Sequence, residues 1–221
     1  MGYWDQVRTV QRRRSIDPGT IAAASVRLLD ESGLAGFTLR GLAGALGVAP
    51  ASLYSRLDGL ADAHDLALDD ALARDADVRQ AVDGAGQVRQ AVDGAGEVRE
   101  LALALYRHLL RHPWAIHVLA ARPPRGPAYL ALSEELVRRL RSSGRGDPLA
   151  LAYAVSNLVL GSALTAGAAR TEPTTPVDDD AAPTYARHHD RAAVDPEAVL
   201  DAALRALLAA PDAGRAAATS T

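Results

Sequence analysis

The apolar residues of this chain recur at the three- and four-residue spacing of helices, and the alternation typical of strands is absent. A first helix is expected to begin at Asp17-Pro18, where an N-cap aspartate precedes a proline at the first helical position, and to end at Ser32-Gly33. Its apolar face carries Ile21, Ala24, Ser25, Leu28 and Leu29. The pattern therefore predicts an all-α fold.

The same spacing predicts further helices along the rest of the chain, over residues 60–75, 101–111, 114–122, 129–142, 148–169 and 196–210. In the helix over 129–142, Leu132, Leu136 and Leu140 form one apolar stripe. Residues 171–194 contain prolines and three consecutive aspartates, which predict a loop. Residues 211–221 are expected to form a tail.

Residues 37–57 have the pattern of a helix-turn-helix. Thr38 can cap a first helix by accepting a backbone N–H, and Gly47 can supply the positive φ of a sharp turn. Pro50 stands at the first position of a second helix, where its missing N–H does no harm. The leucines expected to face the core are Leu39, Leu42, Leu46, Leu53 and Leu57.

The second helix of this motif leaves mostly small and polar side chains outward: Ala51, Ser52, Tyr54, Ser55 and Arg56. A helix of this kind that enters the major groove reads duplex DNA. A purely structural hairpin is the alternative, because leucine spacing alone fits both. The ordered set of Ala43, Gly47 and Leu53, with an N-cap before it and a proline just inside the second helix, favours DNA binding.

Residues 78–97 are a tandem repeat of a ten-residue unit, in which nine of ten positions match. Two copies of so short a unit are too few for a solenoid, and no strand precedes the Asp-Gly-Ala-Gly of each copy to make it a phosphate-binding loop. We interpret the repeat as a duplication that lengthens a helix–helix connection, which loop-closure entropy tolerates.

Residues 148–169 contain no charged side chain. Their length suffices to cross a bilayer, but they are rich in small and polar residues and lack flanking aromatic belts, which argues against a membrane span. A helix that is apolar all round is otherwise buried in a core or an interface. We expect this helix to pack in the core and to form, with the helix over 196–210, a four-helix interface with the same two helices of a second subunit. The residues assigned to this interface are Gly161, Leu200, Leu204, Leu207 and Leu208.

The composition limits the chemistry that is open to the chain. The 221 residues are 48% hydrophobic and 4% aromatic, and cysteine is absent, which excludes disulfides and thiolate metal sites. The net charge is −3, yet residues 1–60 hold seven arginines against five carboxylates, so a mildly basic N-terminal part precedes an acidic remainder. Residues 1–16 hold four arginines and no apolar signal segment, so a cytoplasmic location is expected.

Over residues 17–66 the chain resembles the TetR family of bacterial transcriptional regulators, in Gly-Phe-Thr-Leu-Arg-Gly-Leu-Ala (36–43) and Leu-Gly-Val-Ala-Pro-Ala-Ser-Leu-Tyr (46–54). Less specifically, His-Pro-Trp (112–114) and Arg-Pro-Pro-Arg-Gly-Pro (122–127) resemble the tetracycline-repressor-like C-terminal domains of that family. The resemblance implies an Ω-shaped, all-helical homodimer that binds palindromic operators and releases them when it binds a small molecule.

By position, the resemblance implies that Thr38 contacts phosphate and that Arg40 contacts a base edge or phosphate. It also implies that Ser52 and Tyr54 contact the DNA backbone and that Arg56 lies at the end of the recognition helix. Taken together with the helix-turn-helix pattern, the expected DNA-contact set is Thr38, Arg40, Ala49, Pro50, Ala51, Ser52, Tyr54, Ser55 and Arg56. The chain departs from the family at Leu60, which replaces a lysine that usually grips a phosphate, and Asp58 adds repulsion. The run Arg12-Arg13-Arg14 fits either an arm in the minor groove or a solvated tail.

The expected organisation is a basic arm (1–16), a helix-turn-helix domain (17–66), a helical effector-binding and dimerisation domain (67–210) and the tail. A pocket in the third part should be mostly apolar with a few polar anchors. Candidate anchors, for each of which ordinary core packing is the alternative, are Tyr106, Trp114, His117, Tyr129, Tyr153, Asn157 and Thr165. Asn157 is the most telling of these, because a buried amide needs a partner, either a ligand or the same helix of a second subunit.

His108 and His112 are spaced i, i+4, but without a placed carboxylate they give weak evidence for a metal, and neither metal nor cofactor is expected. The sequence thus favours a ligand-responsive repressor with three partners: a double-stranded DNA operator, a small-molecule effector and a second copy of the chain. The alternative is a small-molecule-binding helical dimer with weak or lost DNA binding, which the missing lysine and the low net charge favour. An enzyme is not expected, since no paired acid and base, nucleophile elbow or metal triad is found.

Overall fold

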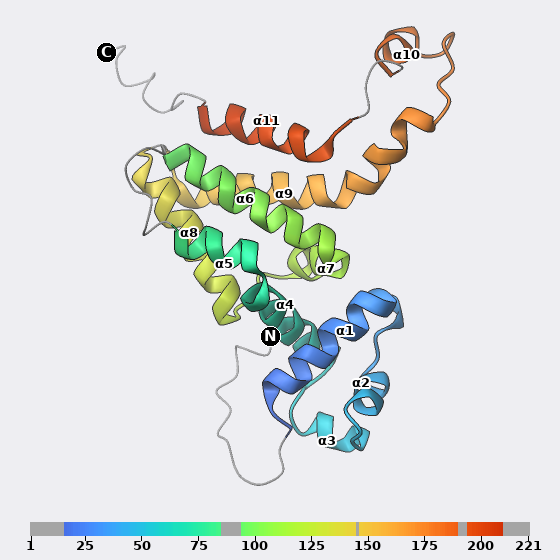
Figure 1. The fold of residues 1–221 in the computed structure, drawn as a ribbon, viewed down its shortest axis with the longest axis vertical. Coiled ribbons are helices and arrows are strands. Elements are labelled where there is room, and N and C mark those ends of the chain that lie inside the picture. The colour runs from blue at the N-terminus through green and yellow to red at the C-terminus, as the bar shows by residue number, and fades with distance from the viewer. Residues whose placement is uncertain (1–15, 85–93, 145, 190–193, 210–221) are drawn as a thin grey trace.

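The computed structural model describes residues 16–84, 94–144, 146–189 and 194–209, and every regular element in these ranges is helical, which confirms the all-α prediction (Figure 1). The N-terminal elements are α1 (Pro18–Gly36), α2 (Leu39–Ala45), α3 (Pro50–Tyr54) and α4 (Leu60–Arg74). They are followed by α5 (Ala76–Asp83), α6 (Gly94–Arg111), α7 (Pro113–Ala121), α8 (Pro127–Ser142), α9 (Pro148–Thr171), the short 3₁₀-helix η3 (Glu172–Thr174), α10 (Pro183–His189) and α11 (Pro196–Ala209).

Helices α1, α2 and α3 form a small head. Asp17 caps α1 by accepting the backbone N–H of Thr20 at 3.1 Å, as predicted. Gly33, with φ 64° and ψ −177°, interrupts α1 at the predicted stop, and the helix resumes to Gly36. The core of the head consists of side chains at most 1% exposed: Ile21, Leu29, Leu42, Leu53 and Leu57.

Helix α4 connects this head to the body (Figure 1). It packs against α1 on the head side and against α7 and α8 on the body side. Nearly all of its side chains between Asp62 and Leu72 are buried, including three aspartates. Because α4 is packed against both parts, a shift of this helix would change how the head is held.

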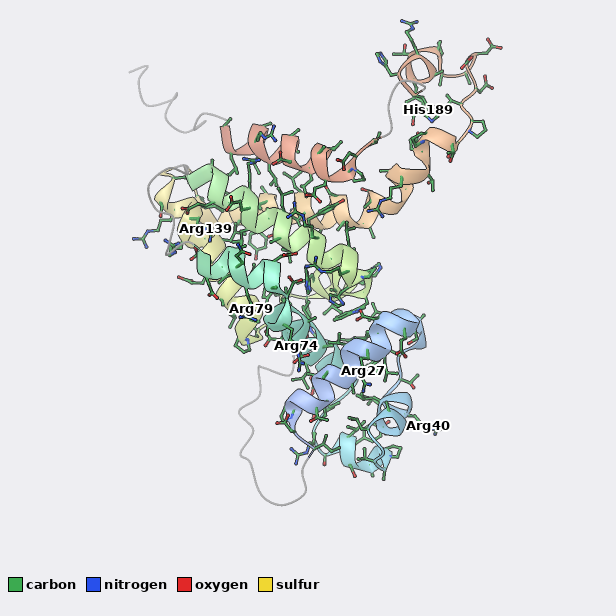
Figure 2. The ribbon with its side chains drawn as sticks, viewed as in Figure 1. Arg27, Arg40, Arg74, Arg79, Arg139 and His189 are labelled. Carbon is green, nitrogen blue, oxygen red and sulfur yellow. The ribbon has the colours of Figure 1, made fainter. Side chains whose placement is uncertain are left out.

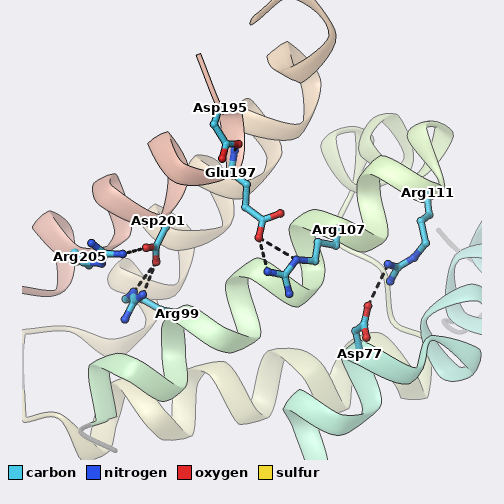
Figure 3. Close-up of polar contacts among 8 residues, drawn as sticks. All are labelled: Asp77, Arg99, Arg107, Arg111, Asp195, Glu197, Asp201 and Arg205. Atoms are coloured by element: carbon cyan, nitrogen blue, oxygen red, sulfur yellow. Dashed lines mark hydrogen bonds and ion pairs between the residues drawn. The ribbon is translucent and has the colours of Figure 1, made fainter. Parts of the chain in front are cut away.

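The body is built around α6, which packs against α8, α9 and α11 (Figure 1). Ion pairs fix α11 on α6: Arg99 contacts Asp201 at 2.5 Å, and Arg107 contacts Glu197 through its guanidinium group (Figure 3). Helix α10 lies at the end of a projection that leaves the body beyond η3 (Figure 1).

Two predictions about connections are incomplete. Residues 78–83 of the first repeat copy lie in α5 and residues 94–97 of the second copy belong to α6, so the repeat is not a connection throughout, and its residues 85–93 lie outside the described part of the chain. Asp75 starts α5 by accepting the backbone N–H groups of Asp77 and Val78, a capping signal just before the repeat. Residues 171–194 are not simply a loop, since they contain η3 and α10.

The leucine face of α11 points into the chain itself. Leu200 and Leu204 are fully buried, Leu208 is 4% exposed and Leu207 is half-buried. These leucines pack within the subunit core, so the prediction that they form the interface with a second subunit is corrected. The large apolar residue that α11 exposes is instead Val199, at 56% exposure.

Candidate nucleic-acid interface and internal cavity

The turn between α2 and α3 has the geometry of a helix-turn-helix. The Thr38 hydroxyl oxygen accepts the backbone N–H of Gly41 at 3.0 Å and so caps α2. Gly47 takes φ 66°, which favours glycine, and the N–H of Val48 donates to the carbonyl of Ala43 at 3.0 Å to close the turn. Pro50 then begins α3.

The buried leucines of this motif fix which side faces outward. Leu39, Leu42, Leu53 and Leu57 are at most 8% exposed. The opposite face exposes Thr38, Arg40, Ala49, Pro50, Ala51, Ser52, Tyr54 and Ser55, with Arg56 half-buried. The predicted DNA-contact residues are therefore exposed on the head apart from the half-buried Arg56, and Figure 2 shows Arg40 on α2.

This exposed face has the chemistry that duplex DNA requires. An exposed arginine can donate to a guanine edge or to a phosphate, and hydroxyl and phenol groups can donate to the backbone. Tyr54 is 62% exposed, so packing within the head does not account for this large aromatic side chain. The face is otherwise built of small side chains, which allow close approach to a groove.

One cavity of the body, partly open and of about 30 Å³, lies between α6, α8 and α9. Its walls are Leu101, Ala102, Leu105, Tyr129, Leu132, Ser133, Leu136, Val155, Ser156 and Val159. The lining carries no charged group, and its polar atoms come from one phenol and two hydroxyls. An apolar cavity with a few polar groups is the usual form of a small-molecule site.

Comparisons with known proteins agree with this arrangement. Residues 93–202 match the family model "Tetracyclin repressor-like, C-terminal domain". Over 144 residues (64% of the chain) the sequence is 37% identical to an HTH-type transcriptional regulator of Saccharopolyspora erythraea. Over 171 residues (76% of the chain) it is 31% identical to the HTH-type transcriptional repressor DrrR1 of Streptomyces coeruleorubidus.

A solved structure, described as a possible TetR family transcriptional regulator from Streptomyces coelicolor A3(2), matches with a TM-score of 0.71 and 26% identity. The match covers 91% of this chain and all of that one. The chain belongs to the TetR family. The aligned regions span 57% and 59% of the length of the two curated relatives.

In this TetR-family chain, the candidate effector residues do not converge on the cavity. Tyr129 alone among them lines it. Tyr106 and Trp114 are buried elsewhere in the core, and the Trp114 indole donates to Asp30 at 2.7 Å. His117, Tyr153, Asn157 and Thr165 are exposed in this chain, so the partner expected for the Asn157 amide, a ligand or the same helix of a second subunit, stays a prediction. The periodicity gave no means to separate residues that face the core of the chain from those on its outer surface.

Helix α9 has a large exposed apolar surface. Leu149, Tyr153 and Leu164 are each more than half exposed, and Gly161 lies on the same outward side. The segment Pro148–Thr174 is also long and apolar enough to cross a membrane by length and composition, with 28% of its most apolar window buried. A single helix of this kind is weak evidence for a membrane span, since core and interface helices pass the same test.

The joint between head and body contains polar contacts that the sequence did not reveal. Asp30 on α1 accepts from the Trp114 indole and lies 2.7 Å from Nδ1 of His112. Next to it, Asp75 contacts Nδ1 of the fully buried His108 at 2.8 Å and the Arg111 guanidinium at 2.5 Å. Contacts of α1 with the α6–α7 corner, and of the start of α5 with α6, thus hold the joint together.

Burial and these contacts together shift the pKa values of His108 and Asp75. Burial, the largest cause, lowers the pKa of His108 to about 4. Burial raises the pKa of Asp75, but the hydrogen bonds from Arg111 and His108 outweigh it and lower the pKa to about 2. At neutral pH the ring is therefore neutral and donates its Nδ1–H to the carboxylate.

Sequence reasoning also missed the aspartates of α4. Asp65 pairs with Arg122 at 2.5 Å, and Arg122 donates to the carbonyl of Ala61 at 2.6 Å. Asp69 binds the start of α8. The spacing of Asp65 and Asp69, four apart among the apolar residues of one helix, could have predicted these contacts, because buried carboxylates are almost always paired. Among the residues the structure describes, no group of three or more ligand side chains suited to a metal is present.

Proposed function

We propose that this TetR-family regulator is a cytoplasmic repressor that binds a palindromic operator as a homodimer and leaves it when a small molecule enters the body. The observation that carries the proposal is the exposed face of α2 and α3, which presents Arg40, Ser52 and Tyr54 together with small side chains. A rigid core beneath this face holds its side chains ready for a groove.

The dimer is supported by the outward faces of α9 and α11. Leu149, Tyr153, Leu164 and Val199 expose large apolar side chains beside Gly161. A two-fold interface pairs the same surface of two copies, so these two helices from each subunit would cover one another. This revises the interface from the buried leucines of α11 to its outer face.

The effector site is supported by the cavity between α6, α8 and α9. Its uncharged walls suit an apolar ligand, with Tyr129, Ser133 and Ser156 available for hydrogen bonds. At about 30 Å³ the cavity is far smaller than the roughly 300–1,000 Å³ of typical ligand sites, so ligand entry must move its walls. A site that opens on binding is suited to changing the affinity of the head for DNA.

The proposal is tested with duplexes that the full chain selects from a randomised pool. Binding should weaken steeply with salt, because each neutralised phosphate releases counterions. Arg40→Ala should cost about 1–3 kcal/mol of binding free energy. The matched control is Arg141→Ala, at an exposed position in the last turn of α8, which should bind as the wild type does. If both variants bound the duplex with equal affinity, Arg40 would not be part of the DNA interface.

The alternative, a ligand-binding dimer with weak or lost DNA binding, is favoured by the first turn of α4. Leu60 is 41% exposed there, at the position where the family resemblance implies a lysine, and Asp58 precedes it. If the chain selects no duplex yet forms a dimer, this alternative replaces the repressor.

A further inference from the structure

The first turn of α8 is capped by a side chain from another helix. One carboxylate oxygen of Asp69, on α4, accepts the backbone N–H of Ala128 at 2.8 Å and that of Tyr129 at 3.2 Å. Gly126, the residue just before α8, has no side chain to offer as a cap, and Pro127 has no N–H. Asp69 therefore satisfies two free donors at the start of α8.

This contact is tight and shielded from water. Asp69 is 8% exposed, and a Cβ atom added at Gly126 would collide with its carboxylate. Burial raises the pKa of Asp69, while the two backbone hydrogen bonds lower it. A buried carboxylate has few alternative partners, so a shift of the first turn of α8 must either move Asp69 or leave it without these bonds.

The same turn of α8 forms part of the cavity wall. Tyr129 donates its backbone N–H to Asp69 and also lines the cavity. Ser133, one turn further along and also in the wall, donates its hydroxyl to the carbonyl of Tyr129 at 2.9 Å. Because the cavity is too small for a ligand, entry of one must displace α8 from α6 or α9 and strain this turn.

Asp69 itself lies on α4, the helix that leads to the head. Helix α4 packs along α1, and its first turn follows the recognition helix α3 after only a short connection. Asp62 in that first turn accepts the backbone N–H of Asp58 at 2.9 Å, which ties the connection to α4. A displacement of α4 is therefore passed to the position of α3.

We infer that Asp69 couples the cavity to the helix-turn-helix, by holding α4 to the first turn of α8 when the cavity is empty and losing that hold when the cavity is filled. The inference rests on the proposed function, because it assigns the route by which the effector site acts on DNA binding. Asp69 is a positioning residue in this account and touches neither ligand nor DNA.

The test replaces the unknown ligand by a side chain that fills the cavity. Ala102, in the cavity wall and 3% exposed, is changed to leucine, and the affinity for the duplex selected by the wild type is measured. Ala102→Leu should lower that affinity about tenfold, within the usual range of coupling between two sites. In an Asp69→Ala background the same change should alter affinity less than about twofold, since the coupling is gone.

Two further variants separate coupling from mere stability. Asp69→Asn keeps a carbonyl acceptor for the two N–H groups and should preserve most of the tenfold effect. Asp70→Ala, which removes the neighbouring aspartate paired with Arg74 on the same helix, should preserve it fully. An equal effect of Ala102→Leu with and without Asp69, or no effect in the wild type, overturns the inference, whereas a wild type that selects no duplex refutes the proposed function instead.

A second measurement covers the case in which Asp69→Ala does not fold. Hydrogen exchange of the backbone N–H groups of Ala128 and Tyr129 is compared between the wild type and Ala102→Leu, both of which keep Asp69. Filling the cavity should speed exchange at these two groups about tenfold or more and leave the buried core of α1 unchanged. Unchanged exchange at the first turn of α8 would overturn the inference.

Discussion

At the scale of single residues, the buried pair of His108 and Asp75 holds the junction of α4 and α5 against α6. The ring is neutral when folded, with a pKa of about 4, whereas in the unfolded chain it titrates near its ordinary value of 6.5. Between these two values the unfolded state binds more protons than the folded state, so stability falls as pH falls. Asp75, whose pKa in the folded state is about 2, also lowers stability as the pH falls, but only below its ordinary pKa of 3.8.

The pH dependence of unfolding should therefore carry the signature of His108. From pH 7 to pH 4 this group should remove up to about 3 kcal/mol from the free energy of unfolding. Urea unfolding of His108→Gln, measured in steps of half a pH unit above pH 4, should lack this part of the slope. His117→Gln, at an exposed position on α7, is the matched control and should keep it. A wild-type slope in His108→Gln would contradict the assignment.

At the scale of elements, Arg139 holds together the two helices that flank residues 84–93. This buried side chain on α8 donates to the carbonyl of Glu97 at 2.7 Å and to the carbonyl of Ala81, and its Nε donates to Glu135 at 2.6 Å (Figure 2). Two carbonyls that bind one guanidinium lie within roughly 8 Å of each other. The ends of α5 and α6 are thus fixed independently of the residues between them.

Excision of one repeat unit, residues 84–93, should therefore leave the fold intact. After excision, five residues still link Ala81 to Glu97, and their extended reach of about 20 Å exceeds the gap. The free energy of unfolding should change by no more than about 1 kcal/mol, because loop length affects it only weakly. Circular dichroism and urea unfolding of the shortened chain measure this. Loss of cooperative unfolding would show that the second copy is needed.

The elements themselves were largely predictable, because their signals are local. Asp17, Thr38 and Pro50 mark helix starts, Gly33 and Gly47 mark a break and a turn, and the structure has each in that role. The helix over residues 78–83 of the first repeat copy was missed, since the Gly-rich composition of the repeat concealed the Asp75 cap before it. Local patterns carry less information about which part of the chain each face of an element meets.

The candidate site was less predictable for the same reason. The exposed face of α2 and α3 follows from leucine spacing within one motif, whereas the cavity wall joins three helices distant in sequence. Tyr129 was among the residues singled out, but the capping of α8 by Asp69 is a contact across 59 residues that no periodicity contains. Likewise, Leu200 and Leu204 have the spacing of any apolar face, and only packing decides whether it meets α6 and α9 or a second copy.

At the scale of the whole molecule, the head, α4 and the body form one connected route from a cavity to a DNA-binding face. The outward faces of α9 and α11, with Tyr153, Leu164 and Val199 exposed, leave an apolar surface of the kind that marks a protein interface. If two copies meet there, each contributes one head, and the pair can read two half-sites related by symmetry.

The central claim, that two copies present their α2–α3 faces to one palindrome, is tested most directly on the duplex that the full chain selects. Hydroxyl-radical footprinting, combined with sedimentation of the complex, gives the protected positions and the number of copies bound. We expect two copies per duplex and two protected half-sites with centres about 34–36 Å apart. A single copy on a single half-site, or no selected duplex at all, would contradict the account.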